Sequence, residues 1–207
     1  MYDCLYFDIW TKNVNTSTMT DRESIILDAS LRLFMRYGVK RTSMGDVAEE
    51  AGVSRQTLYN SFKNKGDILR AQIERYTENA IAEINAGTET MEDLGAKLDL
   101  VFEQMVVVGF DMMVATPNVQ DLVEGIDASS REELEKAAQR FQGAIEQILQ
   151  PYEQALEQSG LCAADLADFA QRSASAAKRS ARDRDHLLRL LSTLRNLCLK
   201  AAEETRH

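Results

Sequence analysis

The sequence predicts an all-α fold in which a small N-terminal head of short helices precedes a larger helical body. Only 2 prolines and 10 glycines interrupt the 207 residues, so long helices meet few breakers. From Thr20 onward, apolar residues recur at helical spacing, and no segment shows the alternation that is typical of a strand. Cap residues and glycines at the boundaries divide this pattern into about nine helices.

Residues 1–18 stand apart from that pattern. They are polar and aromatic, with a stretch rich in Asn, Thr and Ser, and they show no helical period. The run that begins at Met19 reads like a natural protein start. We therefore expect residues 1–18 to be either a poorly ordered extension or an upstream start that the functional protein does not require.

The head is predicted to span residues 21–81. Its first helix begins after Thr20, which stands three residues before Glu23 in the spacing of a capping box. This helix is predicted to end at Tyr37, because Gly38 supplies a left-handed C-terminal conformation.

A helix-turn-helix follows at about residues 44–63. Its two short helices, 44–51 and 55–61, are separated by a turn at Gly52, and hydroxyl residues stand where N-terminal caps are needed. A further helix from 65 to about 85 completes the head.

The body, residues 82–207, continues as helices. Pro117 is expected to end a strongly apolar helix, and Pro151 is expected to kink a longer one. The predicted elements span about 91–114, a short turn or helix to about 125, then 129–159, 163–178 and 183–203.

The second short helix presents side chains of the kinds that contact DNA. Arginine pairs with the guanine edge, glutamine and asparagine with the adenine edge, and a threonine methyl with the thymine methyl, while a tyrosine hydroxyl suits phosphate. The predicted residues are Arg55, Gln56, Thr57, Tyr59 and Asn60. Hydroxyls and ammonium groups at the flanking helix starts also suit phosphate, namely Thr42, Ser43, Lys63 and Lys65. The alternative is that this face is merely solvated.

The charge distribution is compatible with a local DNA contact. The net charge is -9, yet residues 20–75 hold 10 basic and 8 acidic side chains, while residues 76–207 hold 13 and 23. The segment 54–65 carries three basic residues and no acid. A basic face on an acidic molecule binds phosphates, and the acidic body suppresses indiscriminate binding.

The stretch from Ile25 to Ile68 resembles the N-terminal domain of the TetR/AcrR family of transcription regulators. The run AGVSRQTLYNSFKNKGDIL is specific to that family, and the resemblance covers about a quarter of the chain. It rests on Ala29, Leu33, Phe34, Gly38, Thr42, Val47, Ala48, Ala51, Gly52, Val53, Ser54, Thr57, Leu58, Tyr59, Phe62, Lys63, Lys65 and Leu69.

The resemblance implies a transcription regulator, most often a ligand-responsive repressor, that binds a palindromic operator in double-stranded DNA. It places Thr57, Tyr59 and Lys65 at positions that contact DNA in the family. Met44 and Gly45 fall where some members carry polar DNA-contacting residues. Because Gly45 offers only its backbone, we expect the second helix to read the bases.

A homodimer is expected, because one helix-turn-helix reads too few bases for useful specificity. The last two helices are rich in small and leucine residues, and the resemblance implies an intersubunit four-helix bundle there. The alternative is that the stripe packs only within the monomer. The predicted interface is Ala170, Ala174, Ala177, Leu187, Leu190, Leu191, Leu194, Leu197 and Cys198.

An effector pocket is expected in the body from the family resemblance. Flexible methionines and aromatic side chains there suit a small, largely apolar effector, although each of them taken singly fits a plain core. The predicted pocket residues are Phe102, Met105, Phe110, Met113, Phe141 and Tyr152.

Other classes of function find little support in the sequence. The 3 cysteines and 2 histidines form no metal-ligand spacing and no nucleophile–base pair, so we expect no enzyme, metal or cofactor and a reducing cytoplasm. No apolar run approaches the roughly 20 residues of a membrane span. The remaining alternative is a helical scaffold that keeps the fold without specific DNA binding.

Overall fold

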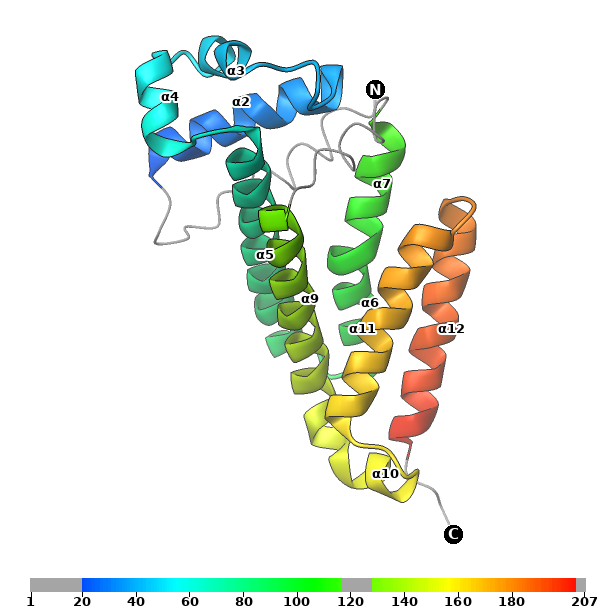
Figure 1. Cartoon of the computed structure of the whole chain (residues 1–207). Helices are drawn as coiled ribbons and strands as arrows, with labels where there is room; N and C mark the ends of the chain where they lie inside the picture. The colour runs from blue at the N-terminus through cyan, green and yellow to red at the C-terminus, as the bar shows by residue number, and fades with distance from the viewer. Residues whose placement is uncertain (1–19, 117–127, 204–207) are drawn as a thin grey trace. The chain divides into compact units, whose positions relative to one another are not determined.

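The structure is a computed structural model that describes residues 20–116 and 128–203 (Figure 1). In these ranges every regular element is a helix, which confirms the predicted all-α class. The chain divides into two compact units, one of Met1–Asn79 with Met112–Ala137 and one of Ala80–Asp111 with Ala138–His207. The head–body boundary at residue 81 stays a prediction.

The head of the first unit begins with α2, and its N-terminal cap forms as predicted. Glu23 N–H donates to Thr20 Oγ1 at 3.3 Å, and Thr20 N–H donates to Glu23 Oε2 at 3.0 Å, which closes the capping box. The elements of the head are α2 (Asp21–Tyr37), α3 (Met44–Glu50), α4 (Arg55–Ser61) and α5 (Lys65–Thr90), the last of which runs on into the second unit.

The exit from α2 differs from the prediction at Gly38. This glycine has φ 84° and ψ 158°, which is extended rather than left-handed helical, although its N–H still donates to Phe34 O at 2.9 Å. A side chain would be strained in this region of backbone space, which is populated almost only by glycine. The extended exit carries the chain directly to Val39, which is 4% exposed in the core of the head.

The core of the head gathers one face from each of its four helices. The members with 1% exposure or less are Ile26, Leu27, Phe34, Val47, Leu58 and Ile68. Burying side chains of this size stabilises the unit by about 1.5–3 kcal/mol each. Because α3 and α4 are each only 7 residues long, this packing rather than intrinsic helix propensity holds them in place.

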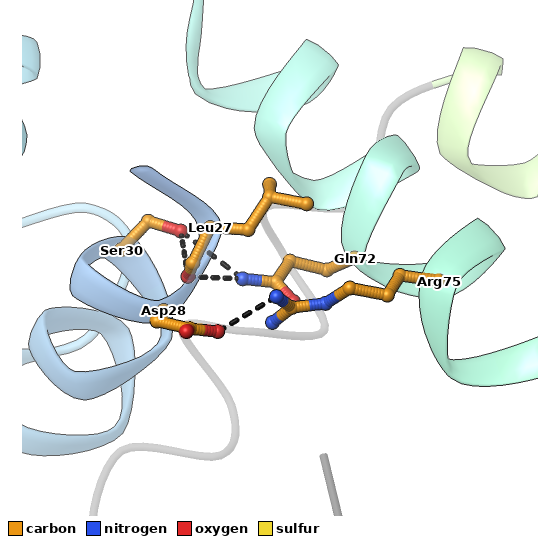
Figure 2. A network of polar contacts seen from close by, with 5 residues as sticks. All are labelled: Leu27, Asp28, Ser30, Gln72 and Arg75. Carbon is orange, nitrogen blue, oxygen red and sulfur yellow. Dashed lines mark hydrogen bonds and ion pairs between the residues drawn. The ribbon is translucent and has the colours of Figure 1, made fainter. Parts of the chain in front are cut away.

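A buried polar network joins α2 to α5 within the first unit (Figure 2). Arg75, 3% exposed, donates from Nη1 to Asp28 Oδ1 at 2.6 Å and from Nη2 to Gln72 Oε1 at 3.1 Å. Gln72 Nε2 in turn donates to the carbonyl of Leu27 and to the hydroxyl of Ser30. The network fixes the register of the first helix of the head on α5.

The helices that follow α5 form two long runs. In the first, Asp93 caps α6 (Leu94–Phe102), a π-helical turn η1 (Glu103–Val107) follows, and α7 (Val108–Ala115) ends the run. The start is later than the predicted residue 91. The short segment predicted after Pro117 lies outside the described residues.

The second long run carries the kink predicted at Pro151. The run consists of α9 (Ala128–Leu149), a 3-10 turn η2 (Gln150–Tyr152) that contains the proline, and α10 (Glu153–Gln158). A proline has no N–H to continue the α-helical hydrogen bonds, so the helix tightens at this point. The run ends at Gly160, whose φ is 72°.

The last two helices of the second unit run side by side in opposite directions (Figure 1). They are α11 (Ala163–Ser180) and α12 (Arg184–Ala202), and Asp183 caps the second one by accepting the N–H of His186 at 2.7 Å. The small residues of α11 allow α12 to approach closely. Ala167, Ala170 and Ala174 are each 0% exposed.

Candidate nucleic-acid interface

The helix-turn-helix of the first unit is held by local hydrogen bonds. Ser43 caps α3 in a capping box with Asp46. Gly52, at φ 64°, turns the chain, and Val53 N–H donates back to Ala48 O at 2.9 Å. Ser54 then caps α4 by accepting the N–H of Thr57 at 3.1 Å. These bonds fix the angle at which α4 leaves the turn.

One face of α4 is buried and the other is open to solvent. Leu58 is fully buried in the core of the head, whereas Arg55, Gln56, Tyr59 and Asn60 are all exposed. The structure therefore brings four of the five predicted base- and phosphate-contacting residues of this helix onto its solvent side.

Two hydrogen bonds order the polar side chains of this exposed face. Gln56 Nε2 donates to Asn60 Oδ1 at 2.9 Å, which leaves the other amide groups of the pair available to a partner. Thr57 is half-buried, and its hydroxyl lies 2.8 Å from that of Ser54. The Thr57 hydroxyl is thus part of the cap.

Gly45 on α3 makes room for the side chain of Arg55 on α4. A Cβ at residue 45 would stand 2.9 Å from Arg55 Nη2 and 3.4 Å from Cζ. A contact under 3.0 Å forces the flexible side chain to move. Gly45, which lies outside the predicted set, therefore decides where the guanidinium of Arg55 rests.

Asp46 adds a fixed negative charge at the start of α3. Hydrogen bonds from the backbone and then the side chain of Ser43 lower the pKa of the Asp46 carboxyl, and the positive charges of Arg55 and Lys65 lower this pKa further. The carboxylate accepts the N–H of Ser43 at 2.7 Å. It therefore stays ionised at neutral pH and draws the Arg55 side chain toward α3.

The side chains of Thr42 and Lys65 donate hydrogen bonds to backbone carbonyls of the head. The hydroxyl of Thr42 is buried and donates to Gly38 O at 2.9 Å. Lys65 Nζ donates to Val39 O at 2.6 Å and to Thr42 O at 2.8 Å, with a longer bond to Lys40 O at 3.4 Å. Both side chains therefore hold the loop between α2 and α3, and a phosphate contact by either of them stays a prediction.

The other predicted phosphate ligands remain exposed. Ser43 and Lys63 lie at the surface, and Lys63 N–H donates to Asp67 Oδ2 at 3.0 Å while its ammonium points to no described partner. Arg41, an exposed cation two residues before the cap of α3, lies outside the predicted set. A cation close to a helix N-terminus, as Arg41 is to α3 and Lys63 is to α5, favours the binding of phosphate.

The predicted pocket residues are mostly core residues. Phe102, Met105, Phe110 and Phe141 are each at most 8% exposed, and Met113 and Tyr152 are half-buried. One hollow lies over the C-terminal part of α9 and the start of η2, and it is lined by Gly143, Glu146, Gln147 and Gln150. The predicted set does not line this hollow.

The predicted dimer interface divides into two groups. Most of its members are buried within the single chain, and their use for a second copy stays a prediction: Ala170, Ala174, Ala177, Leu187, Leu191, Leu194 and Cys198. Leu190 is half-buried, and Leu197 is 55% exposed. Phe169, outside the predicted set, is 57% exposed. The apolar residues along α11 and α12 are evident in the sequence. Which of them are buried within the single chain is not.

Among residues 20–116 and 128–203, no three side chains of His, Cys, Asp or Glu come together as metal ligands would. Nor is any helix within those ranges both long and apolar enough to cross a membrane.

The head is similar in sequence to known bacterial regulators. Residues 26–71 match the family model described as bacterial regulatory proteins, tetR family. The HTH-type transcriptional regulator AcrR of Shigella flexneri is 44% identical over 59 residues, which are 28% of this chain and 27% of that protein. The chain spans 27 to 41% of the length of the first curated relatives that it matches.

Two solved structures extend the likeness to nearly the whole fold. The fatty acid degradation regulator FadR from Bacillus halodurans matches 87% of this chain and 96% of its own, with a TM-score of 0.63 and 15% identity. FadR from Bacillus subtilis, solved in complex with stearoyl-CoA, matches 86% of this chain and 97% of its own, with a TM-score of 0.54 and 16% identity. At such identities the likeness concerns the fold.

Proposed function

We propose that this chain, whose residues 26–71 match the family model of the tetR bacterial regulatory proteins, is a regulator of that family and acts in the cytoplasm by binding operator DNA as a homodimer. The observation that carries the proposal is the exposed face of α4. Arg55, Gln56, Tyr59 and Asn60 are exposed on a helix that follows a glycine turn. A helix presented in this way fits the major groove, where these side-chain types distinguish base pairs.

Side-chain chemistry predicts which residues contact bases and which contact phosphates. Arg55 reads a guanine, and the Gln56–Asn60 pair reads an adenine through the amide groups that it leaves available. Tyr59, Lys63, Ser43 and the half-buried Thr57 position the helix on the phosphates. Thr42 and Lys65 hold the loop that carries α3. Base discrimination thus rests on α4.

The test is selection of duplexes from a random pool, followed by affinity measurement at two salt concentrations. Arg55→Ala is expected to relax preference at one base pair, at a cost of about 1–3 kcal/mol. Arg140→Ala removes the same charge from an exposed position on α9 and serves as the control. A wild-type protein that enriches no sequence overturns the proposal and favours a scaffold that keeps only the fold.

The dimer is proposed to form through the outer sides of α11 and α12. Leu190 and Leu197 stand seven residues apart, so they share one side of α12, and Phe169 adds an exposed aromatic ring on α11. A dimer pairs two copies of α4 on the two halves of a palindrome, about 34 Å or a multiple apart. Exposed large apolar side chains on adjacent helices are typical of such interfaces.

Leu197→Asp tests the interface by light scattering. The carboxylate would be buried against the second copy, so the variant is expected to become monomeric and to lose palindrome binding by at least about tenfold. Leu134→Asp changes another exposed leucine, 43% exposed on α9, and should leave the mass of the particle unchanged. A dimer that survives Asp at 169, 190 and 197 together would place the interface elsewhere.

A ligand-responsive repressor is the proposed mode of action. FadR from Bacillus subtilis, whose structure resembles this chain, is solved with stearoyl-CoA, which supports a helical body that takes an apolar effector. The two DNA-binding heads can adopt an arrangement that fits the operator and one that does not. An effector lowers operator affinity only to the extent that it binds the second arrangement more tightly than the first. The measurement is release of the selected duplex on addition of candidate effectors. If none releases the duplex, a constitutive regulator is the better description.

A further inference from the structure

Positive charge gathers along the second half of α2 and in the loop that follows it. Residues 29–45 hold four basic side chains and no acidic one. One of these charges is neutralised within the head, because Arg32 pairs with Glu50 at 2.8 Å. The other three side chains are exposed, namely Arg36, Lys40 and Arg41. The head thus has a second acid-free basic segment besides the one that begins at α4.

The ammonium group of Lys65 orders the loop between α2 and α3. Its Nζ donates to the carbonyls of Val39 at 2.6 Å and Thr42 at 2.8 Å, with a longer bond to the carbonyl of Lys40 at 3.4 Å. The three N–H donors of an ammonium are matched by these three acceptors. The hydroxyl of Thr42 also donates to Gly38 O at 2.9 Å. The backbone of the loop is therefore fixed from within, before any partner binds.

Arg41 extends from this ordered loop without a partner of its own. Among the described residues its guanidinium meets no acceptor and no carboxylate. A structural arginine of the same head is paired, as Arg75 is with Asp28 at 2.6 Å. Arg36, at the end of α2, lies over the ring of Tyr37 at 5.1 Å from its centroid, and Tyr37 is itself 44% exposed. The surface of the loop therefore offers cations that the fold does not use.

The loop lies next to the side chain that is proposed to read a base. Gly45 is the common neighbour, because Ser43 Oγ and Arg55 Cζ would each stand 3.4 Å from a Cβ at that residue. Arg41 precedes Ser43 by two residues, so their Cα atoms lie within about 7 Å of each other. All of these residues belong to the first compact unit. A duplex that meets Arg55 therefore passes close to the cations of the loop.

We propose that Arg36, Lys40 and Arg41 form a second DNA contact, which binds the phosphate backbone beside the bases that α4 reads. Guanidinium and ammonium groups both bind phosphate oxygens through charge-assisted hydrogen bonds. Such contacts add affinity and fix the orientation of the recognition helix without reading sequence. Because Lys65 orders the loop beforehand, little conformational entropy is lost on binding. This inference rests on the proposed DNA binding and adds three residues to its surface.

The experiment measures the affinity of the full chain for its selected duplex over a range of salt concentrations. Arg41→Gln should reduce the slope of log affinity against log salt by about 1, and the change of all three residues to Gln should reduce it by about 3. The selected sequence should stay the same. Arg41→Lys preserves the charge and should keep the slope. Arg140→Gln, at an exposed position on α9, is the control and should also keep it.

Duplexes that each carry one methylphosphonate locate the contact on the backbone. This group replaces a charged phosphate oxygen by a methyl group at a single linkage. At the linkage that Arg41 contacts, the neutral group should weaken binding by the wild type and have no effect on Arg41→Gln. Two changes that act through one contact are not additive, so this loss of effect identifies the pair.

Two results overturn the proposal. One is a salt slope of Arg41→Gln equal to that of the wild type, because the cations of the loop are then only solvated. The other is a melting temperature of Arg41→Gln well below that of the wild type, because Arg41 is then a structural residue.

Selection of duplexes separates this proposal from the proposed function. If Arg55→Ala relaxes base preference while Arg41→Gln keeps the wild-type slope, only the contact of the loop fails. If the wild type enriches no sequence but Arg41→Gln still reduces the slope on an arbitrary duplex, the contact of the loop stands and operator recognition fails.

Discussion

The guanidinium of Arg55 on α4 lies against the backbone of Gly45 on α3, so that a Cβ at residue 45 would stand 2.9 Å from Nη2. The carboxylate of Asp46 lies beside this contact and interacts with the same guanidinium. The first helix of the motif therefore contributes to DNA recognition, although Gly45 has no side chain that could contact a base. It sets the position from which Arg55 reaches the groove.

Gly45→Ala tests this relationship directly. The new methyl group displaces the Arg55 side chain, so base preference should shift at the pair that Arg55 reads, with a loss of affinity no larger than that of Arg55→Ala. Alanine is the better helix former, so α3 should not lose stability. The measurement is selection of duplexes by the variant, followed by its melting temperature.

Gly143→Ala is the matched control, because its added Cβ meets no atom within 4 Å. It should leave the selected sequence unchanged and raise stability by roughly 0.5–1 kcal/mol. In a background of Arg55→Ala, Gly45→Ala should have no further effect, since two changes that act through one contact are not additive. An equal effect in both backgrounds would mean that Gly45 acts through the backbone.

Substitutions of Lys63 and Lys65 should have different effects, although the two residues are only two positions apart. The first should weaken DNA binding, and the second should lower the stability of the fold. Lys65→Met removes the donor to the carbonyls of Val39 and Thr42, which lowers the free energy of unfolding by about 1–3 kcal/mol. Lys63→Met removes an exposed cation, which should leave unfolding unchanged. It should reduce the slope of log affinity against log salt by about 1.

Urea unfolding and salt titrations of DNA binding measure the two effects. The opposite assignment, with a salt effect at residue 65 and a stability effect at residue 63, would restore the role that the sequence predicted for Lys65. Lys63→Arg should keep the salt slope, because it preserves the charge.

The sequence predicted the helix caps correctly where the capping hydrogen bonds join residues that are close together in the chain. The caps at Thr20 and Ser54 depend on residues three positions away, and both formed as predicted. Lys65 is different, since its acceptors lie 23 to 26 residues upstream in the chain. A lysine at a helix start suits phosphate and a carbonyl cluster equally, so only the folded head distinguishes them.

The second unit shows the same limit for apolar patterns. Leu191 and Leu197 belong to one leucine-rich stripe, yet the first is 5% and the second 55% exposed. The helical spacing of these apolar residues shows that they share one side of the helix. It does not show which of them are buried within the monomer. The π-helical turn at Glu103–Val107 also left no signal, because apolar residues occupy it as they would an α-helix. Lys178 lies against Gly109, 69 positions earlier in the chain, and this contact exists only because the fold packs α11 beside η1 and the start of α7.

The ion pair between Asp28 and Arg75 should contribute far more to stability than the one between Arg32 and Glu50. Arg75 is buried and its Nε has no hydrogen-bond partner among the described residues, so removal of Asp28 leaves a desolvated guanidinium. Asp28→Ala should lower the free energy of unfolding by about 3–5 kcal/mol. Glu50→Ala breaks a pair whose side chains are 44% and 39% exposed, which should cost at most about 1 kcal/mol.

Chemical denaturation of both variants at low and high salt gives the comparison. The effect of Glu50→Ala should shrink with salt because solvent ions screen exposed charges, and that of Asp28→Ala should persist. Similar losses in the two variants would mean that the network of Figure 2 relaxes to let water reach Arg75.

The unpartnered Lys178 should give stability a characteristic dependence on pH. Its pKa falls from 10.5, the ordinary value, to about 8 in the folded protein. Between these values the unfolded chain holds a proton that the folded chain has released, so stability rises with pH. Below pH 8 both states are protonated and the folded protein bears the full cost of the buried charge. Lys178→Met removes this dependence.

The expected signature is therefore a difference between two proteins. Relative to the wild type, Lys178→Met should be more stable at pH 7 than at pH 10.5, by up to about 3 kcal/mol. Asp111, Glu103 and Arg184, the charged groups of the neighbouring elements, are present in both proteins and cancel in the difference. Cys198 also cancels, since burial raises its pKa to about 11.

Urea unfolding of both proteins at pH 7, 8, 9 and 10 provides the measurement, with Lys200→Met as a variant whose difference from the wild type should stay constant. Any change in packing by the methionine adds an offset that does not vary with pH, so the slope alone carries the information. A flat difference would show that the ammonium is hydrated in the folded protein.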